Sequence, residues 1–324
     1  MTKGMELKRR RLGRTAWQVT ELGLGCYQYT GEFGVRQEEA ERILDLAFES
    51  GVNFFDTAEM YGFGESEELL GRALVRHGRA GVRISTKVGW LDRTVIRNLG
   101  DTAYTDEVAL MRAIKHSFWL LQEDHIDALM IHEPVDTWQW KLDLRTGDAP
   151  VMSVLERLKK EGVIGAIGLG GWNCDAIADL LETGRFDVAL IAGGVSLLGQ
   201  PIKARVLPAA KKHDVGIILG GALGQGNLVT VDRKAAQEMI DSPKQHAQPE
   251  RGRKLLAAYD LSEETGISLV ELAMRYVAGM PEIHTHIAGA RERAHLEANI
   301  TSVLKGPLPP EIVAKIESIG RSEG

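Results

Sequence analysis

Four ionisable residues in this chain, Asp56, Tyr61, Lys87 and His132, stand at or just beyond the ends of short apolar runs. The runs are VNFFD, RISTK and IDALMIH, and buried parallel strands have this composition. In a barrel of parallel strands, the residues at the carboxyl ends of the strands lie on one face. We therefore expect a carboxylate, a phenol, an ammonium group and an imidazole to share one pocket.

Together these groups can move a proton at neutral pH. A phenol has an ordinary pKa near 10, and a neighbouring ammonium group such as Lys87 would lower the pKa of Tyr61. Asp56 would keep Lys87 charged, and His132 could donate a hydrogen bond to a substrate carbonyl. Such a set protonates an oxygen while a hydride reaches the adjacent carbon, or removes that proton in reverse. Each residue alone has an ordinary structural explanation, but their joint position on consecutive strands favours a site.

The elements that must position these residues alternate along the whole chain. The predicted strands are residues 21–25, 52–56, 83–87, 126–132, 165–170, 187–193, 215–220 and 284–289. Amphipathic helical segments separate them, for example residues 37–51, where Gly51 marks the stop. Eight such alternations predict a (β/α)8 TIM barrel, preceded by an N-terminal β-hairpin that turns at Gly13. A doubly wound open sheet is the alternative fold, but no GxGxxG stands at a strand-to-helix junction.

Three connections are longer than a barrel requires: residues 89–105, 133–150 and 221–267. All three leave the carboxyl ends of strands. This is the face on which barrel enzymes build their sites. Long loops are therefore expected to border the predicted pocket.

Composition limits the classes of function. The chain has 324 residues, a net charge of -6 and a hydrophobic fraction of 44%, as ordinary globular proteins have. The acidic balance argues against a nucleic-acid surface, and no apolar run is long enough to cross a membrane. Two isolated cysteines without metal-ligand spacing, and no apolar leader, indicate a cytoplasmic protein without a metal site. We expect one domain over residues 1–324 and a small-molecule substrate, with the oligomeric state left open.

The segment GVNFFDTAEMYGFGESEELLGRAL, residues 51–74, resembles the signature of the aldo-keto reductase family, in which an Asp and a Tyr stand five residues apart. STKVG at 85–89 resembles the lysine strand of that family, and LMIHEP at 129–134 its histidine strand. Two further matches are residues 12–27 and 287–300, and the stretches 166–173 and 186–200 are similar to the aldose 1-dehydrogenase branch. The resemblance covers nearly the whole chain.

The resemblance implies a barrel that binds a nicotinamide cofactor without a Rossmann domain. Hydride would pass between the cofactor and a carbonyl or alcohol of a sugar or other small aldehyde or ketone. Tyr61 would be the general acid or base, and Asp56, Lys87 and His132 would have the roles given above.

The resemblance also implies a cofactor site, predicted for NADP with NAD possible. Its positions are Gly170, Trp172, Asn173, Gly221, Ala222, Leu223, Gly289, Arg291, His295 and Asn299. The glycine-rich loop 220–228 would cover the pyrophosphate with backbone N–H groups. The residues after 289 begin a helix whose positive end favours phosphate. Arg291 can pair with a 2′-phosphate and favours NADP, whereas Glu292 beside it favours NAD.

The sequence departs from the family pattern at the nicotinamide. Gly170 and Gly171 stand where the family has a Ser-Asn pair that grips the carboxamide, and Ala192 and Val195 stand where it has a Gln and a stacking Tyr. Residues that could compensate are Trp172, Asn173 and Ser196. Alternatively, the glycines admit a close approach of the backbone to a ligand.

Aromatic residues on the predicted loops could line a substrate pocket. They are Tyr27, Phe63, Trp90 and Trp138. Such rings stack on sugar rings or hold apolar aldehydes. Two other functions stay open: a barrel lyase or isomerase that uses Tyr61 and Lys87 without net redox change, and a regulatory subunit that senses a nucleotide cofactor.

Overall fold

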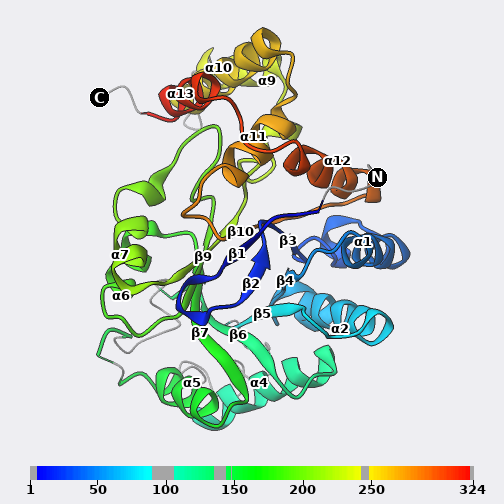
Figure 1. Cartoon of the computed structure of the whole chain (residues 1–324), viewed down its shortest axis with the longest axis vertical. Helices are drawn as coiled ribbons and strands as arrows, with labels where there is room; N and C mark the ends of the chain where they lie inside the picture. The colour runs from blue at the N-terminus through cyan, green and yellow to red at the C-terminus, as the bar shows by residue number, and fades with distance from the viewer. Residues whose placement is uncertain (1–5, 90–105, 135–143, 147, 242–247, 322–324) are drawn as a thin grey trace.

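The computed structural model describes residues 6–89, 106–134, 144–146, 148–241 and 248–321. Eight parallel strands form a closed barrel in the order β10-β3-β4-β5-β6-β7-β8-β9 (Figure 1). The strands are β3 (Leu22–Gly25), β4 (Phe54–Asp56), β5 (Arg83–Val88), β6 (Ile126–His132), β7 (Ile164–Gly171), β8 (Val188–Ala192), β9 (Gly216–Gly220) and β10 (Thr285–Ala288). The predicted TIM barrel and all eight predicted strands are confirmed, with ends that differ by at most two residues.

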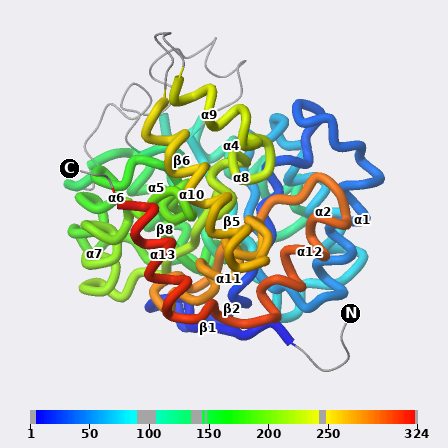
Figure 2. The backbone as a smooth tube through the Cα atoms, turned by 90° about the horizontal axis from the view of Figure 1, so that it is seen from above, coloured from blue at the N-terminus to red at the C-terminus, as the bar shows by residue number. Residues whose placement is uncertain are grey.

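A ring of helices covers the outside of the barrel (Figures 1 and 2). They are α1 (Gln37–Glu49), α2 (Glu65–His77), α4 (Glu107–Leu121), α5 (Pro150–Lys160), α6 (Cys174–Leu181), α7 (Val206–His213), α11 (Leu269–Ala278) and α12 (Arg293–Leu304). Each turns its apolar face to the strands, because every strand residue that points outward needs an apolar cover. Side-chain caps fix several starts: Asp106 accepts hydrogen bonds from the amides of Val108 and Ala109 at the start of α4.

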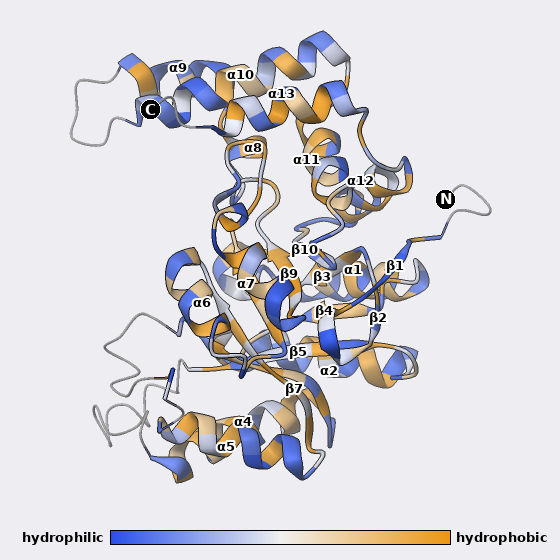
Figure 3. Cartoon of the chain, turned by 60° about the vertical axis from the view of Figure 1, so that its left-hand side comes forward, coloured by the Kyte–Doolittle hydropathy of each residue, from blue (hydrophilic) through white to orange (hydrophobic). Residues whose placement is uncertain are grey.

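Four further helices lie outside this ring. The β9–α11 connection contains α8 (Asn227–Thr230), α9 (Arg233–Asp241) and α10 (Pro249–Thr265), and α13 (Pro310–Gly320) ends the described chain. Figure 3 shows α9, α10 and α13 side by side, beyond one side of the barrel. The long connection predicted after β9 is thus largely helical.

The N-terminal hairpin closes the amino-terminal end of the barrel. Strands β1 (Arg9–Arg11) and β2 (Gln18–Thr20) pair antiparallel around the turn η1 (Gly13–Thr15), as predicted. Leu12 and Val19 belong to the apolar cluster that fills the barrel interior, so the hairpin is part of the core. Gly13 has a φ of +50°, and a Cβ there would lie 2.2 Å from the amide nitrogen of Gly216. Only glycine allows this close approach.

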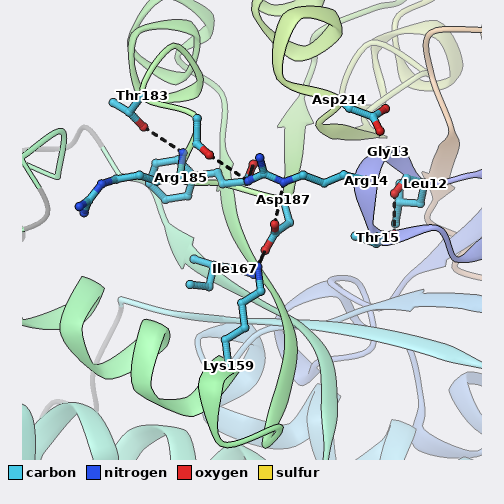
Figure 4. A network of polar contacts seen from close by, with 12 residues as sticks. Leu12, Gly13, Arg14, Thr15, Lys159, Ile167, Thr183, Arg185, Asp187 and Asp214 are labelled. Atoms are coloured by element: carbon cyan, nitrogen blue, oxygen red, sulfur yellow. Dashed lines mark hydrogen bonds and ion pairs between the residues drawn. The ribbon is translucent and has the colours of Figure 1, made fainter.

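A buried carboxylate, Asp187, ties the hairpin to the barrel (Figure 4). Its Oδ1 accepts a hydrogen bond of 2.8 Å from Nε of Arg14, on the hairpin turn. Its Oδ2 accepts from the amide of Ile167 at 2.9 Å and from Nζ of Lys159 at 2.5 Å. One side chain therefore joins the hairpin, β7 and α5.

The helices of the described ranges include none that is long and apolar enough to span a bilayer.

Candidate active site

Three of the four predicted catalytic residues stand at the carboxyl ends of neighbouring strands. Asp56 ends β4, Lys87 is the penultimate residue of β5 and His132 ends β6. The pairing register places Asp56 beside Ser85, and His132 beside Gly170 of β7. All three side chains are buried, at the end of the barrel opposite the hairpin.

The ammonium group of Lys87 is the centre of the arrangement. Nζ donates hydrogen bonds to Oδ2 of Asp56 at 2.7 Å, to the carbonyl oxygen of Thr57 at 2.8 Å and to the hydroxyl of Tyr61 at 3.0 Å. Oδ1 of Asp56 accepts from Ser85 at 2.7 Å. An ammonium group has three hydrogens, so all of them are engaged. The oxygen of Tyr61 is then an acceptor toward Lys87, and its own hydrogen is left to point elsewhere.

Tyr61 is held by a turn rather than by a strand. It opens η3 (Tyr61–Gly64), where Gly62, Phe63 and Gly64 have φ of 62°, 50° and 101°. A Cβ on Gly62 would lie 2.9 Å from Cβ of Thr30, so this position requires glycine. Phe63 in the left-handed region costs about 1–2 kcal/mol, and such strain is concentrated at functional sites. The loop after β4 thus folds sharply and directs the phenol of Tyr61 to Lys87.

Aromatic rings enclose the phenol. The ring centroids of Tyr61 and His132 lie 5.9 Å apart, at an angle of 81°. Tyr27 packs on Tyr61 at 4.7 Å and on Phe33 at 4.7 Å. His132 therefore faces the same phenol as Lys87, and the structure brings all four predicted residues together.

Burial determines the protonation states. It raises the pKa of Tyr61 to about 12, and the charge of Lys87 only partly offsets this effect. The predicted lowering of that pKa is thus outweighed by desolvation, and the phenol is neutral at pH 7. Burial also acts against the charge on Lys87, but Asp56 and Tyr61 more than offset it and raise the pKa of Lys87. Burial, followed by the charge of Lys87, lowers the pKa of His132 well below its usual value, so that the imidazole is neutral.

A charged amine, a neutral phenol and a neutral imidazole beside one another at the carboxyl end of the barrel suit proton transfer to an oxygen. A family model described as the aldo/keto reductase family matches residues 21–321. The chain belongs to the aldo/keto reductase family.

Known proteins of similar sequence and structure support this family assignment. The chain is 27% identical to a pyridoxal 4-dehydrogenase from Microbacterium luteolum, over 97% of each chain. It is 30% identical to a D-threo-aldose 1-dehydrogenase from a Pseudomonas species, over 67% of this chain and 69% of that one. The holo form of the aldo-keto reductase AKR11C1 from Bacillus halodurans superposes with a TM-score of 0.76 at 25% identity, over 98% of this chain and 97% of that chain. This aldo/keto reductase is therefore an oxidoreductase of a family that uses nicotinamide cofactors.

The predicted nicotinamide positions of this aldo/keto reductase lie at the end of β7. A Cβ on Gly170 would lie 3.2 Å from Cδ of Lys87, so this glycine leaves room for the lysine stem. Trp172 is 57% exposed just beyond the strand. Asn173 caps α6, and its side-chain oxygen accepts from the amide of Ala176 at 3.1 Å. That oxygen is therefore already used in the fold.

The predicted pyrophosphate loop follows β9. Gly221 has a φ of +76° and its carbonyl accepts from the amide of Gly224 at 2.9 Å, which forms a tight turn. The amides of Ala222 and Leu223 make no hydrogen bond to any residue that the structure describes. Two adjacent free amides in such a turn are donors that fit an anion.

The predicted adenosine positions follow β10. Gly289 comes directly after the strand and packs against Gln28, and Arg291 borders a cavity beside the start of α12. His295 is exposed on α12, whereas Asn299 is buried in it. The cavity and the free amides fit the polar parts of a dinucleotide, while the nicotinamide grip common in the family has no counterpart at Gly170 and Gly171.

Of the predicted substrate-pocket residues, Tyr27 is 43% and Phe63 52% exposed, and both stand beside Tyr61. Trp90 and Trp138 lie outside the described residues.

Sequence reasoning missed three contacts of the site. Ser85 lies two residues before Lys87 on the same strand, so the alternation of side chains along β5 would have indicated it. The carbonyl of Thr57 and the ring of Phe33 reach the site through loop geometry, for which the sequence contains no signal.

Proposed function

We propose that this chain transfers a hydride between a nicotinamide cofactor and the carbonyl or alcohol carbon of a sugar or other small aldehyde or ketone. Tyr61 exchanges the proton with the substrate oxygen. The observation that carries the proposal is the bonding of Lys87, whose three donors fix the oxygen of Tyr61 as an acceptor.

Each of the four site residues has a separate role in the reduction. The bound nicotinamide supplies the hydride. The hydroxyl of Tyr61 gives its proton to the substrate oxygen, and the charge of Lys87 at 3.0 Å stabilises the phenolate that results. Asp56 orients Lys87 and compensates the charge of this buried ammonium group. Neutral His132 donates a hydrogen bond that polarises the substrate carbonyl.

Free amides and a charged cavity support the assignment of the cofactor. The amides of Ala222 and Leu223 would hold the pyrophosphate, and the cavity at Arg291 would take the adenosine end. The choice between NADP, predicted from Arg291, and NAD depends on the other charges in that cavity.

Exposed rings at the same end of the barrel support the proposed substrate class. Tyr27 and Phe63 are among the large hydrophobic side chains left exposed. Such rings stack on the faces of sugars and on aromatic aldehydes. Relatives named for an aldose and for pyridoxal accord with a sugar or a small aldehyde as the substrate.

The first test follows the absorbance of reduced nicotinamide with a panel of aldoses, aldehydes and ketones. We expect Tyr61→Phe to lower kcat/KM by about 10²–10⁴-fold, as loss of a general acid does. Binding of NADH, read from its fluorescence, should be retained. Tyr29→Phe is the matched control, because the buried hydroxyl of Tyr29 has no hydrogen-bond partner among the described residues.

Each failure has a distinct meaning. Full activity of Tyr61→Phe would remove Tyr61 from the chemistry. If neither dinucleotide binds, the redox function is wrong. Binding without turnover of any panel member would favour a sensor of the cofactor, and turnover without a change in absorbance would favour a lyase or isomerase.

A further inference from the structure

A cavity of about 470 Å³ lies between the start of α1 and the start of α12. These helices are neighbours in the outer ring (Figure 1). The cavity is lined by Gly34, Val35, Arg36, Glu39, Arg291, Glu292, Arg293 and Ala294. It contains the position, Arg291, on which the expectation of NADP was based, together with Glu39, which the sequence did not single out.

Glu39 occupies the N-terminus of α12. Its Oε1 accepts a hydrogen bond of 2.8 Å from the backbone amide of Arg293, the first residue of that helix. This bond lowers the pKa of Glu39, so the side chain is a carboxylate at neutral pH. The positive end of α12, which would otherwise favour a phosphate, already holds an anion supplied by the neighbouring helix.

The cavity is lined by three arginines, Arg36, Arg291 and Arg293, and by two carboxylates, Glu39 and Glu292, so the lining carries one net positive charge. Nε of Arg293 pairs with Oε1 of Glu297 at 3.1 Å, along the outer face of α12. Glu39 is also paired: its Oε2 lies 3.4 Å from Nη1 of Arg42, which stands one turn further along α1 and does not line the cavity. The carboxylate of Glu39 nevertheless lies at the end of α12 that a phosphate would otherwise occupy. A 2′-phosphate carries about 1.5–2 negative charges at pH 7 and would face the carboxylate of Glu39. A ribose 2′-hydroxyl is neutral and can donate to a carboxylate, and acidic residues make this contact in NAD-binding folds.

Arg291 is the lining cation that favours a phosphate. Its guanidinium lies 5.8 Å from the ring centroid of Phe33, and it forms no ion pair with any carboxylate in the described ranges. It is therefore available to a phosphate. Discrimination between the two cofactors is then a competition between Arg291 and Glu39.

We propose that Glu39 is a specificity-determining residue that makes this cavity accept the 2′-hydroxyl of NAD(H) and disfavour the 2′-phosphate of NADP(H). The inference rests on the proposed function, because it takes the cavity as the adenosine end of the cofactor site. It replaces the preference for NADP that Arg291 alone predicted.

The test measures binding separately from turnover. Dissociation constants of NADH and NADPH are obtained from fluorescence, and those of 5′-AMP and 2′,5′-ADP from calorimetry, on the full chain. We expect the wild type to bind NADH about tenfold or more tightly than NADPH, because a carboxylate facing a phosphate costs binding free energy of that order. The adenine mononucleotides should show the same order without a nicotinamide.

Glu39→Gln removes the charge but keeps a side-chain oxygen for the amide of Arg293. It should shift the NADPH-to-NADH affinity ratio toward NADPH by about tenfold, with little change for NADH. Glu38→Gln is the matched control, because Glu38 is exposed on the same helix and does not line the cavity. Its ratio should equal that of the wild type. Arg291→Gln should shift the ratio in the opposite direction.

A wild type that prefers NADPH, or a Glu39→Gln variant with the wild-type ratio, would overturn the inference. If Glu39→Gln does not fold, a wild type that binds NADPH more tightly than NADH still overturns the inference. Failure of the wild type to bind either dinucleotide would instead overturn the proposed function, so the two failures are distinguishable.

Discussion

At the scale of single residues, the site depends on one ammonium group. Lys87 has no hydrogen left over, because Asp56, Thr57 and Tyr61 accept all three. This fixes the direction of the bond to Tyr61, which a more flexible amine would leave open. In the proposed function the phenol is therefore the proton donor, and burial keeps it protonated.

The pKa of Tyr61 predicts how the two directions of the reaction depend on pH. Reduction needs the protonated phenol, and with a pKa of about 12 this form predominates throughout pH 6–10. Oxidation needs the phenolate, whose fraction rises about tenfold for each pH unit below that pKa. We expect kcat/KM for carbonyl reduction to be nearly flat over this range with respect to Tyr61, and kcat/KM for alcohol oxidation to increase steeply. Initial rates in both directions check this, and an oxidation profile that levels off near pH 7 would contradict it.

At the scale of elements, a buried carboxyl joins α2 to the strand that holds Lys87. Oε1 of Glu67 accepts a hydrogen bond of 2.6 Å from the hydroxyl of Thr86, the residue before Lys87. Burial raises the pKa of Glu67 to about 7, while the hydrogen bond from Thr86 acts against this rise. Glu67 therefore connects α2 to the strand behind the proposed catalytic lysine.

The raised pKa of Glu67 predicts a pH dependence of stability. Below the ordinary value of 4.5 the carboxyl is neutral in both the folded and the unfolded chain, and its stabilising effect is fully present. As the pH rises from about 4.5 through about 7, the unfolded chain ionises first and that stability is lost, by roughly 3 kcal/mol.

The amide side chain of Glu67→Gln cannot ionise, so this variant should not show the loss of stability that the ionisation of Glu67 causes. The free energy of unfolding of the wild type minus that of Glu67→Gln should fall between pH 5 and pH 8, as measured by urea titration. Glu68→Gln, on the exposed face of the same helix, should parallel the wild type. A constant difference between wild type and Glu67→Gln at all pH values would show that Glu67 does not titrate in this range.

At the scale of the whole molecule, the two ends of the barrel have different tasks. The hairpin end is closed by apolar packing and by Asp187, whereas the opposite end holds the proposed catalytic groups. Because the ends are separated by the filled interior of the barrel, a change at the hairpin should affect stability and leave the chemistry of the folded protein intact.

Asp187→Ala should lower the free energy of unfolding by about 2–3 kcal/mol, because it leaves the buried amide of Ile167 and two cations without their acceptor. Asp179→Ala, which removes an exposed pair with Arg205, should cost less than about 1 kcal/mol. Urea midpoints give both values. Equal midpoints for the two variants would contradict a structural role of Asp187, and a lower kcat/KM of folded Asp187→Ala would contradict the separation of the two ends.

The sequence by itself determined the barrel and the arrangement of the candidate catalytic groups. A parallel strand buried on both faces must be a nearly continuous apolar run, so eight such runs separated by amphipathic helices have few possible folds. Once the barrel was inferred, Asp56, Lys87 and His132 had to meet, because the ends of neighbouring parallel strands share one face. The short apolar runs and the residues at their ends can both be read from neighbouring positions in the sequence.

The tertiary structure alone decided what depends on distant packing. Three features depend on how the loops and outer helices pack around the barrel. They are the sharp turn that holds Tyr61, the raised pKa of Tyr61 and the contact of Glu39 with α12. Glu39 and Arg293 are separated by 254 positions, and no periodicity links them. Burial and charge are sums over such neighbours in space, so the sequence names the candidate reacting groups, while the fold sets their protonation and the proposed choice of cofactor.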